Sequence, residues 1–113
     1  MQPKKAGSKG LSYRRVLVAF AEIGDLITRD PALRGGRPII AGTGICVRTI
    51  AVESNRGFSP EEIAADRPAL TLSQIHAALA FYYANQREID ADIAAEERAY
   101  DDGVRASGLP LQP

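Results

Sequence analysis

Apolar residues recur at helical spacing in the second half of the chain. Leu72, Ile75, Leu79 and Tyr82 lie three or four positions apart, which predicts a helix with one buried stripe and Thr71 as its N-cap. The residues expected on its other faces are mostly small or polar: Ser73, Gln74, Ala77, Ala80 and Ala84.

A shorter helix is predicted just before this one. Ser59 is placed as an N-cap, Pro60 as the first helical residue, and Glu62 completes a capping box three residues after Ser59. The helix, residues 60–65, ends at Arg67 because a residue that precedes proline is pushed out of the helical conformation. Two helices joined by such a corner are the pattern of a helix-turn-helix.

Short apolar runs predict β-structure in the first half. Leu26 to Thr28 is a strand candidate, and the runs 39–41 and 45–47 are separated by Gly-Thr-Gly. Glycine supplies the positive φ of a tight turn, so these runs predict a small hairpin. A helix is expected from Thr49 to Arg56, ended by Gly57.

The first residues are polar and basic, so residues 1–12 predict a disordered arm. The segment from Tyr13 to Ile23 fits either a strand or a helical turn, although its β-branched and aromatic residues favour a strand. The segment is too short for its periodicity to decide between the two.

The end of the chain predicts a helix with a thin apolar edge. Residues 86–99 are good helix formers, but only Ile89 and Ile93 continue an apolar face among acidic residues. We therefore expect this helix to extend outward and to bind a partner protein rather than its own core. The end of the chain from Gly103 onward, with Gly108 and two prolines, is expected to be loose.

These elements predict one mainly α domain with a small β-hairpin. Its organisation is a basic arm and extra segment (1–24), a helix-turn-helix-like core (25–86) and an acidic helical extension with a loose end (87–113). A length of 113 residues allows one hydrophobic core.

Composition narrows the class of protein. No apolar run approaches the roughly 20 residues that span a bilayer, and no secretory signal is evident, so a cytoplasmic protein that does not bind membranes is expected. With a single cysteine and a single histidine the chain has no intrachain disulfide, and neither a zinc site nor a cofactor is predicted. Catalysis at His76 or Cys46 is not expected, since no nucleophile and base pair can be assembled from them.

The zero net charge conceals an asymmetry along the sequence. Residues 1–60 carry ten Lys or Arg against four Asp or Glu, which gives +6, and residues 61–113 carry four against ten, which gives −6. This division indicates a half that faces a polyanion and an acidic half, or simply a mixed surface once the chain folds.

Two stretches of the chain form a recognisable pattern: R-G-G-R-P-I-I-A-G-T-G-I-C-V and, after about ten residues of helix, G-F-S-P-E-E-I-A-A-D-R-P-A-L-T-L-S-Q-I-H-A-A-L-A-F-Y. This pattern resembles the domain of unknown function 433 family, small bacterial proteins similar to VapB-type antitoxins, and the resemblance covers Leu26 to about Ile93. It implies a homeodomain-like or winged helix-turn-helix core, a homodimer and a nuclease-like toxin as partner. The family pattern has Arg where this chain has Gly44, and the chain begins with about two dozen extra residues.

Operator DNA is one predicted ligand. A recognition helix presents its N-terminal residues to the major groove, and basic residues neutralise the phosphates. The predicted DNA-binding residues are Lys4, Lys5, Lys9, Arg14, Arg15, Arg56, Arg67, Thr71, Ser73 and Gln74. Against this prediction, no Lys or Arg occurs between Pro68 and Gln86.

A toxin is the other predicted partner. If the toxin's site is a cluster of carboxylates, an arginine of this chain could occupy it, and Arg87, Arg98 and Arg105 are the candidates, with Ile89 and Ile93 as an apolar anchor. The sequence thus predicts a non-enzymatic binding protein, the antitoxin of a type II toxin-antitoxin module. The alternative is a homodimeric adaptor or scaffold that binds no DNA.

Overall fold

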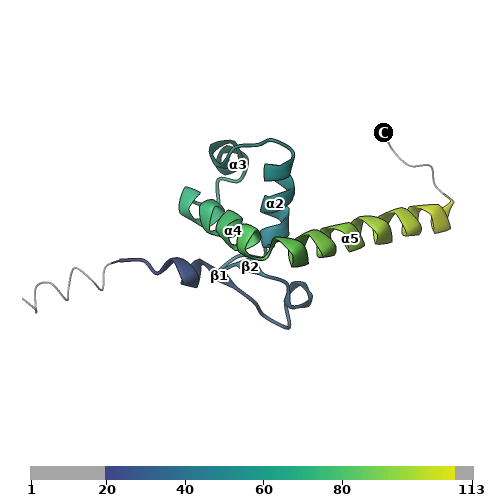
Figure 1. Ribbon diagram of the computed structural model, residues 1–113, viewed down its shortest axis with the longest axis horizontal. Coiled ribbons are helices and arrows are strands. Elements are labelled where there is room, and N and C mark those ends of the chain that lie inside the picture. Colours follow the sequence, from purple (N-terminus) through teal and green to yellow (C-terminus); the bar gives the residue numbers. More distant parts are fainter. Residues whose placement is uncertain (1–19, 109–113) are drawn as a thin grey trace, which may run out of the picture.

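The computed structural model describes residues 20–108 of the chain (Figure 1). The basic arm with Lys4, Lys5, Lys9, Arg14 and Arg15 lies outside the described residues, as do most of the segment before Ile23 and the last five positions. The expectations for those residues therefore remain predictions.

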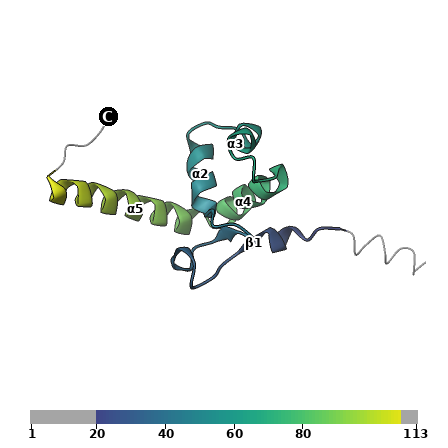
Figure 2. The same cartoon turned by 180° about the vertical axis from the view of Figure 1, so that it is seen from behind.

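Four helices and a two-stranded sheet make up the described fold. Two short 3-10 helices, written η, accompany the four α-helices. In chain order the elements are η1 (Ile23–Leu26), β1 (Ile27–Thr28), η2 (Arg34–Gly36), β2 (Ile39–Ile40), α2 (Val47–Asn55), α3 (Pro60–Asp66), α4 (Leu72–Ala84) and α5 (Gln86–Ser107). Helices α2, α3 and α4 pack together, the sheet lies beneath them, and α5 runs away from this body (Figures 1 and 2). The expectation of a mainly α protein with a small β-element is confirmed.

The sheet differs from the predicted hairpin. β1 pairs with β2 in antiparallel register, with Ile27 opposite Ile40, so the partner strand comes from before the glycine turn. The second arm of the predicted hairpin is reduced to a single bridge between Ile39 and Cys46. Helix α2 begins directly after Cys46, two residues earlier than expected, which leaves no residues for a second strand.

Helix α5 continues to Ser107, past the predicted helical residues 86–99, so the expectation that the chain is loose from Gly103 was wrong up to Ser107.

The predicted starts of α3 and α4 are confirmed by their caps. The Ser59 hydroxyl accepts a hydrogen bond from the backbone N–H of Glu62 at 3.1 Å, and the Glu62 carboxylate accepts one from the N–H of Ser59 at 2.9 Å. Thr71 and Gln74 repeat this arrangement at the start of α4. These reciprocal bonds satisfy backbone N–H groups that a helix end leaves unpaired.

Loss of the Ser59 hydroxyl is expected to destabilise the protein modestly. Ser59→Ala should lower the free energy of unfolding by about 1 kcal/mol, because one N–H of α3 loses its acceptor. Urea denaturation measures the change, and Ser59→Asp, which keeps an acceptor, should restore most of it. Equal stability of the wild type and the alanine variant would contradict the capping role.

The core lies where α2, α3 and α4 meet over β2. Fully buried side chains include Ile40, Val47, Ile50, Ile63 and Ile75. Ile89 of α5 belongs to the same cluster, with Ile93 packed against it. The core of this small protein thus draws on all four α-helices.

Two assignments on α4 were wrong. Leu72, expected in the buried stripe, is 41% exposed, and Ala77, expected on the outer face, is 5% exposed. The rest of the predicted stripe, Ile75, Leu79 and Tyr82, is buried as expected. Helices α2 and α3 pack on this side of α4. The hydrophobicity of α4 varies little around its axis, so spacing alone did not place Leu72 and Ala77.

Candidate functional site

An open groove of about 490 Å³ runs along the outer face of α2. Its floor is formed by residues of α2 between Arg48 and Arg56, and its walls by the loops before α2, the end of α3 and Glu96 of α5. The charged residues that line it are Arg34, Arg48, Arg56, Arg67, Glu53 and Glu96, a net charge of +2. The groove is therefore a candidate site for an anionic ligand.

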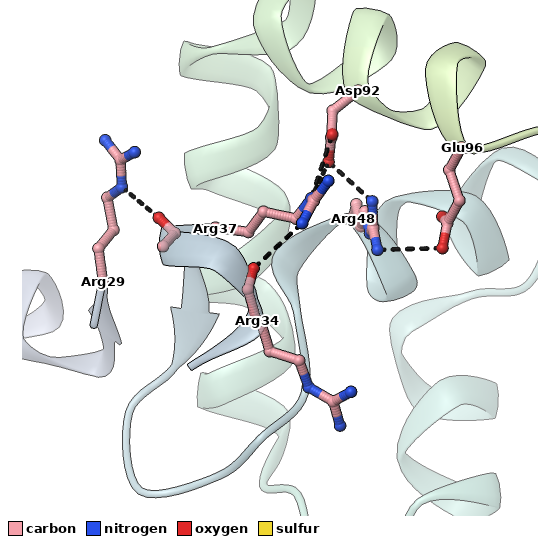
Figure 3. Close-up of polar contacts among 7 residues, drawn as sticks. Arg29, Arg34, Arg37, Arg48, Asp92 and Glu96 are labelled. Atoms are coloured by element: carbon pink, nitrogen blue, oxygen red, sulfur yellow. Dashed lines mark hydrogen bonds and ion pairs between the residues drawn. The ribbon is translucent and has the colours of Figure 1, made fainter. Parts of the chain in front are cut away.

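Arg34 is held at one end of the groove by the backbone. Its φ of +54° is in the left-handed region, and its Nε donates to the carbonyl oxygen of Gly44 at 2.9 Å. Figure 3 shows the end of this side chain pointing away from Asp92, and its two terminal nitrogens have no partner among the described residues. Two donors of a positioned guanidinium are thus available to a ligand.

Arg56 lies at the other end of α2. The residue is exposed, and no side chain among residues 20–108 neutralises it. Arg67, in contrast, forms an ion pair with Glu53, and its Nε donates to Glu53 Oε2 at 3.1 Å. Hydrogen bonding to Glu53 raises the pKa of the Arg67 guanidinium above its ordinary value.

Arg37 and Arg48 connect the body of the protein to α5 (Figure 3). Arg37 Nε donates to Asp92 Oδ2 at 2.8 Å, and Arg48 Nη1 reaches the same oxygen at 2.9 Å. Arg48 Nη2 also pairs with Glu96 Oε2 at 3.0 Å. The hydrogen bond from Arg37, followed by the charges of both arginines, holds the pKa of the Asp92 carboxyl below its usual range.

A second polar contact fixes the start of α5. The Tyr82 hydroxyl donates to Asp90 Oδ1 at 2.6 Å and accepts from Asn55 Nδ2 at 3.1 Å. The bond to Asp90 raises the pKa of Tyr82, because the carboxylate favours the protonated phenol. Since these residues come from α2, α4 and α5, the three helices are joined at one point.

The predicted DNA-binding residues that the structure describes lie in two places. Arg56 and Arg67 line the groove, whereas Thr71 and Ser73 are exposed at the start of α4 and hydrogen bond to each other at 3.0 Å. Gln74 Oε1 accepts from the N–H of Thr71 at 2.7 Å, so its amide oxygen caps the helix. A contact between Gln74 and a DNA base stays a prediction.

Sequence reasoning overlooked Arg34 and Arg48 as site residues. Arg34 precedes a Gly-Gly pair, and such a turn could have suggested a fixed backbone position. No sequence signal marks Arg48, which joins the groove only because α2 begins before it and packs near α5.

The predicted partner-binding residues fall into two groups, the isoleucines in or against the core and the arginines on the surface. Ile89 is 7% exposed in the core and Ile93 is half-buried against it, so the expectation that this edge is too thin to pack on the chain's own core was wrong. Arg87 and Arg98 are exposed without a partner in the described part of the chain. Arg105 pairs with Asp102 at 3.2 Å on the surface.

Neither His76 nor Cys46 is arranged with other reactive groups. His76 is exposed on α4, and Cys46 is buried at the start of α2. Across residues 20–108 no three His, Cys, Asp or Glu side chains are grouped as a metal site would require. In the same range, no helix has the length and apolar character needed to cross a bilayer.

The fold and groove define a small, mainly helical protein with a two-stranded antiparallel sheet and an arginine-lined surface. Residues 27–82 match the family described as "Protein of unknown function (DUF433)". The chain belongs to this family.

A solved structure supports the same relationship. The crystal structure of a DUF433 member protein from Anabaena variabilis is 29% identical in sequence and superimposes with a TM-score of 0.58, covering 82% of this chain and 86% of that one. No curated protein matches the sequence.

Proposed function

We propose that this protein is a non-enzymatic binding protein, the antitoxin of a two-component module, which holds a toxin protein with the outer part of α5. The observation that carries the proposal is the division of α5 into a packed and a projecting part. Residues of the first turns pack on the core through Ile89 and Ile93, whereas residues 95–107 are exposed apart from half-buried Val104.

The projecting part has the features of a helix that binds in the groove of a partner. Tyr100, which is 65% exposed, and Val104 lie four residues apart on one face. Acidic residues flank them, and Arg98 and Arg105 offer guanidinium groups that could enter a carboxylate-lined toxin site. An aromatic anchor with charged neighbours is the composition expected at a protein interface.

DNA is the second ligand in this proposal. Helices α3 and α4, joined at Arg67, would form a homeodomain-like or winged helix-turn-helix, with Thr71 and Ser73 facing the bases. Their exposed position at the start of α4 supports this arrangement. The protein would act as a cytoplasmic homodimer on its own operator.

A homodimeric adaptor without DNA affinity is the second candidate, favoured by the outer face of α4. Leu72 and Tyr83 on this helix are 41% and 61% exposed, and Ala80 between them is also exposed. Such a face could join two copies whether or not DNA is bound. A stable dimer that fails to bind upstream DNA at low salt would favour the adaptor.

Charge placed on the apolar face of outer α5 is expected to abolish toxin binding. Tyr100→Glu combined with Val104→Glu should weaken capture of the neighbouring gene's product at least ~100-fold, because both anchors would carry charge into the interface. Co-purification and calorimetry with that product measure the effect.

Ala106→Glu is the matched control, since residue 106 is also exposed and lies on roughly the opposite side of the helix. It should bind like the wild type. Wild-type protein that does not bind the product, or a double variant that binds as tightly as Ala106→Glu, would refute the toxin-binding role of α5.

A further inference from the structure

We infer that the arginine-lined groove on α2 binds the phosphodiester backbone of a nucleic acid. This inference deepens the DNA-binding part of the proposed function and places the main electrostatic contact on α2, away from the bases that α4 would meet. DNA binding by the groove does not require the toxin-binding part of α5, so an experiment can refute one of these two roles and leave the other standing.

The length of the groove fits several successive phosphates. Arg48 and Arg56 are eight residues apart on one helix, which is about 12 Å along its axis. Adjacent phosphates of one DNA strand lie farther apart along the backbone than their axial rise of about 3.4 Å, so this distance spans roughly two to three of them. Arg34 and Arg67 add cations on the two walls of the same groove.

The availability of the cations favours a ligand with spaced negative charges. Arg34 presents two terminal nitrogens and Arg56 its whole guanidinium, with no acidic partner for either among the described residues. Arg48 and Arg67 are already balanced by Glu96 and Glu53. The two available cations therefore lie toward opposite ends of the groove, where an extended anion reaches both and a single small anion does not.

The chemistry of the lining favours phosphate over other groups. The two available cations, Arg34 and Arg56, are arginines, whose planar guanidinium can bond two oxygens of a phosphate at once. The groove is open, as a continuous backbone requires, and its lining shows no enclosed apolar pocket for a base. This form of contact would bind many sequences, with selection of sequence left to α4.

The carboxylate of Glu96 should oppose the binding of a phosphate in the groove. It lines the groove while it pairs with Arg48, and its side chain is 58% exposed. A phosphate in the groove would meet this negative charge, so removing the charge should strengthen binding. Arg48 would remain held by Asp92.

The test is fluorescence anisotropy of the full chain with a labelled, mixed-sequence DNA duplex at several salt concentrations. Arg34→Gln and Arg56→Gln should each weaken binding roughly tenfold and each reduce the slope of log affinity against log salt by about 1. Glu96→Gln should tighten binding several-fold, an effect that a loss of folding cannot imitate. Arg87→Gln, an exposed and unpaired arginine outside the groove, is the control and should change little.

Three results would overturn the inference. The first is the absence of DNA binding by wild-type protein at low salt. The second is binding that survives loss of both Arg34 and Arg56 but is lost in Thr71→Ala with Ser73→Ala, which would place the contact on α4. The third is tighter binding of a poly-glutamate peptide than of DNA in the same assay, which would make the groove a site for acidic protein segments.

Discussion

Replacing Ile75 by alanine is expected to lower the free energy of unfolding by about 2–5 kcal/mol. Ile75 is fully buried in the cluster where α4 meets α2 and α3, so the shorter side chain loses apolar contacts and leaves a cavity. Small domains have about 5–15 kcal/mol of stability, so this change removes a large share of it. Urea denaturation followed by circular dichroism measures the difference.

Leu72→Ala on the same helix is the matched control. Leu72 is three residues away and of similar size, but 41% of it is exposed, so its loss should cost less than about 1 kcal/mol. Two variants of equal stability would show that α4 packs with a different face than the structure shows.

Replacing Asp92 by alanine should loosen α5 from the body of the protein. Asp92 accepts from both Arg37 and Arg48, and the alanine leaves the half-buried Arg48 with Glu96 alone. We expect a loss of about 1–3 kcal/mol, between the values of exposed and buried ion pairs. Hydrogen exchange of α5 amides, together with urea denaturation, measures it.

Asp101→Ala tests whether any carboxylate on α5 has this effect. Asp101 is exposed and forms no ion pair with the described residues, so its removal should be nearly neutral. Equal hydrogen exchange in the Asp92 and Asp101 variants would contradict the anchoring role of Asp92.

The contribution of Asp92 to the free energy of unfolding should also depend on pH. Its pKa in the folded protein lies below the ordinary value of 3.8, so the unfolded chain binds the proton more readily. The stabilisation is therefore fully present above 3.8 and is lost as the pH falls through the lower folded value. The stability difference between wild type and the Asp92→Ala variant should shrink over that acidic range.

Local signals in the sequence were sufficient for the starts of α3 and α4, but not for the end of α5 at Ser107. Ser59 and Thr71 cap α3 and α4 as expected, because a cap depends on residues within three positions. Strand pairing depends on residues far apart, so the sequence did not reveal that Ile40 pairs with Ile27 rather than lying in an extended hairpin. The membership of the DUF433 family was likewise evident from the glycine and helix pattern.

The sequence predicted only two of the four arginines that line the candidate site. Arg56 and Arg67 were predicted as anion-binding residues, and both line the groove. Arg34 and Arg48 were not predicted, since their place beside Arg56 follows from the path of the chain around α2. The charge asymmetry of the two sequence halves gave no hint that Glu96 and Arg48 would share one surface.

By itself, the sequence determined the helical character of the protein, the caps of α3 and α4 and the family, because these depend on short-range patterns and composition. The tertiary structure decided that Leu72 of α4 is exposed and Ala77 buried, and that Ile89 packs on the chain's own core. It also decided which arginines meet in the groove. These features depend on how distant segments pack, and the free energy of burial and ion pairing is fixed only when those segments meet.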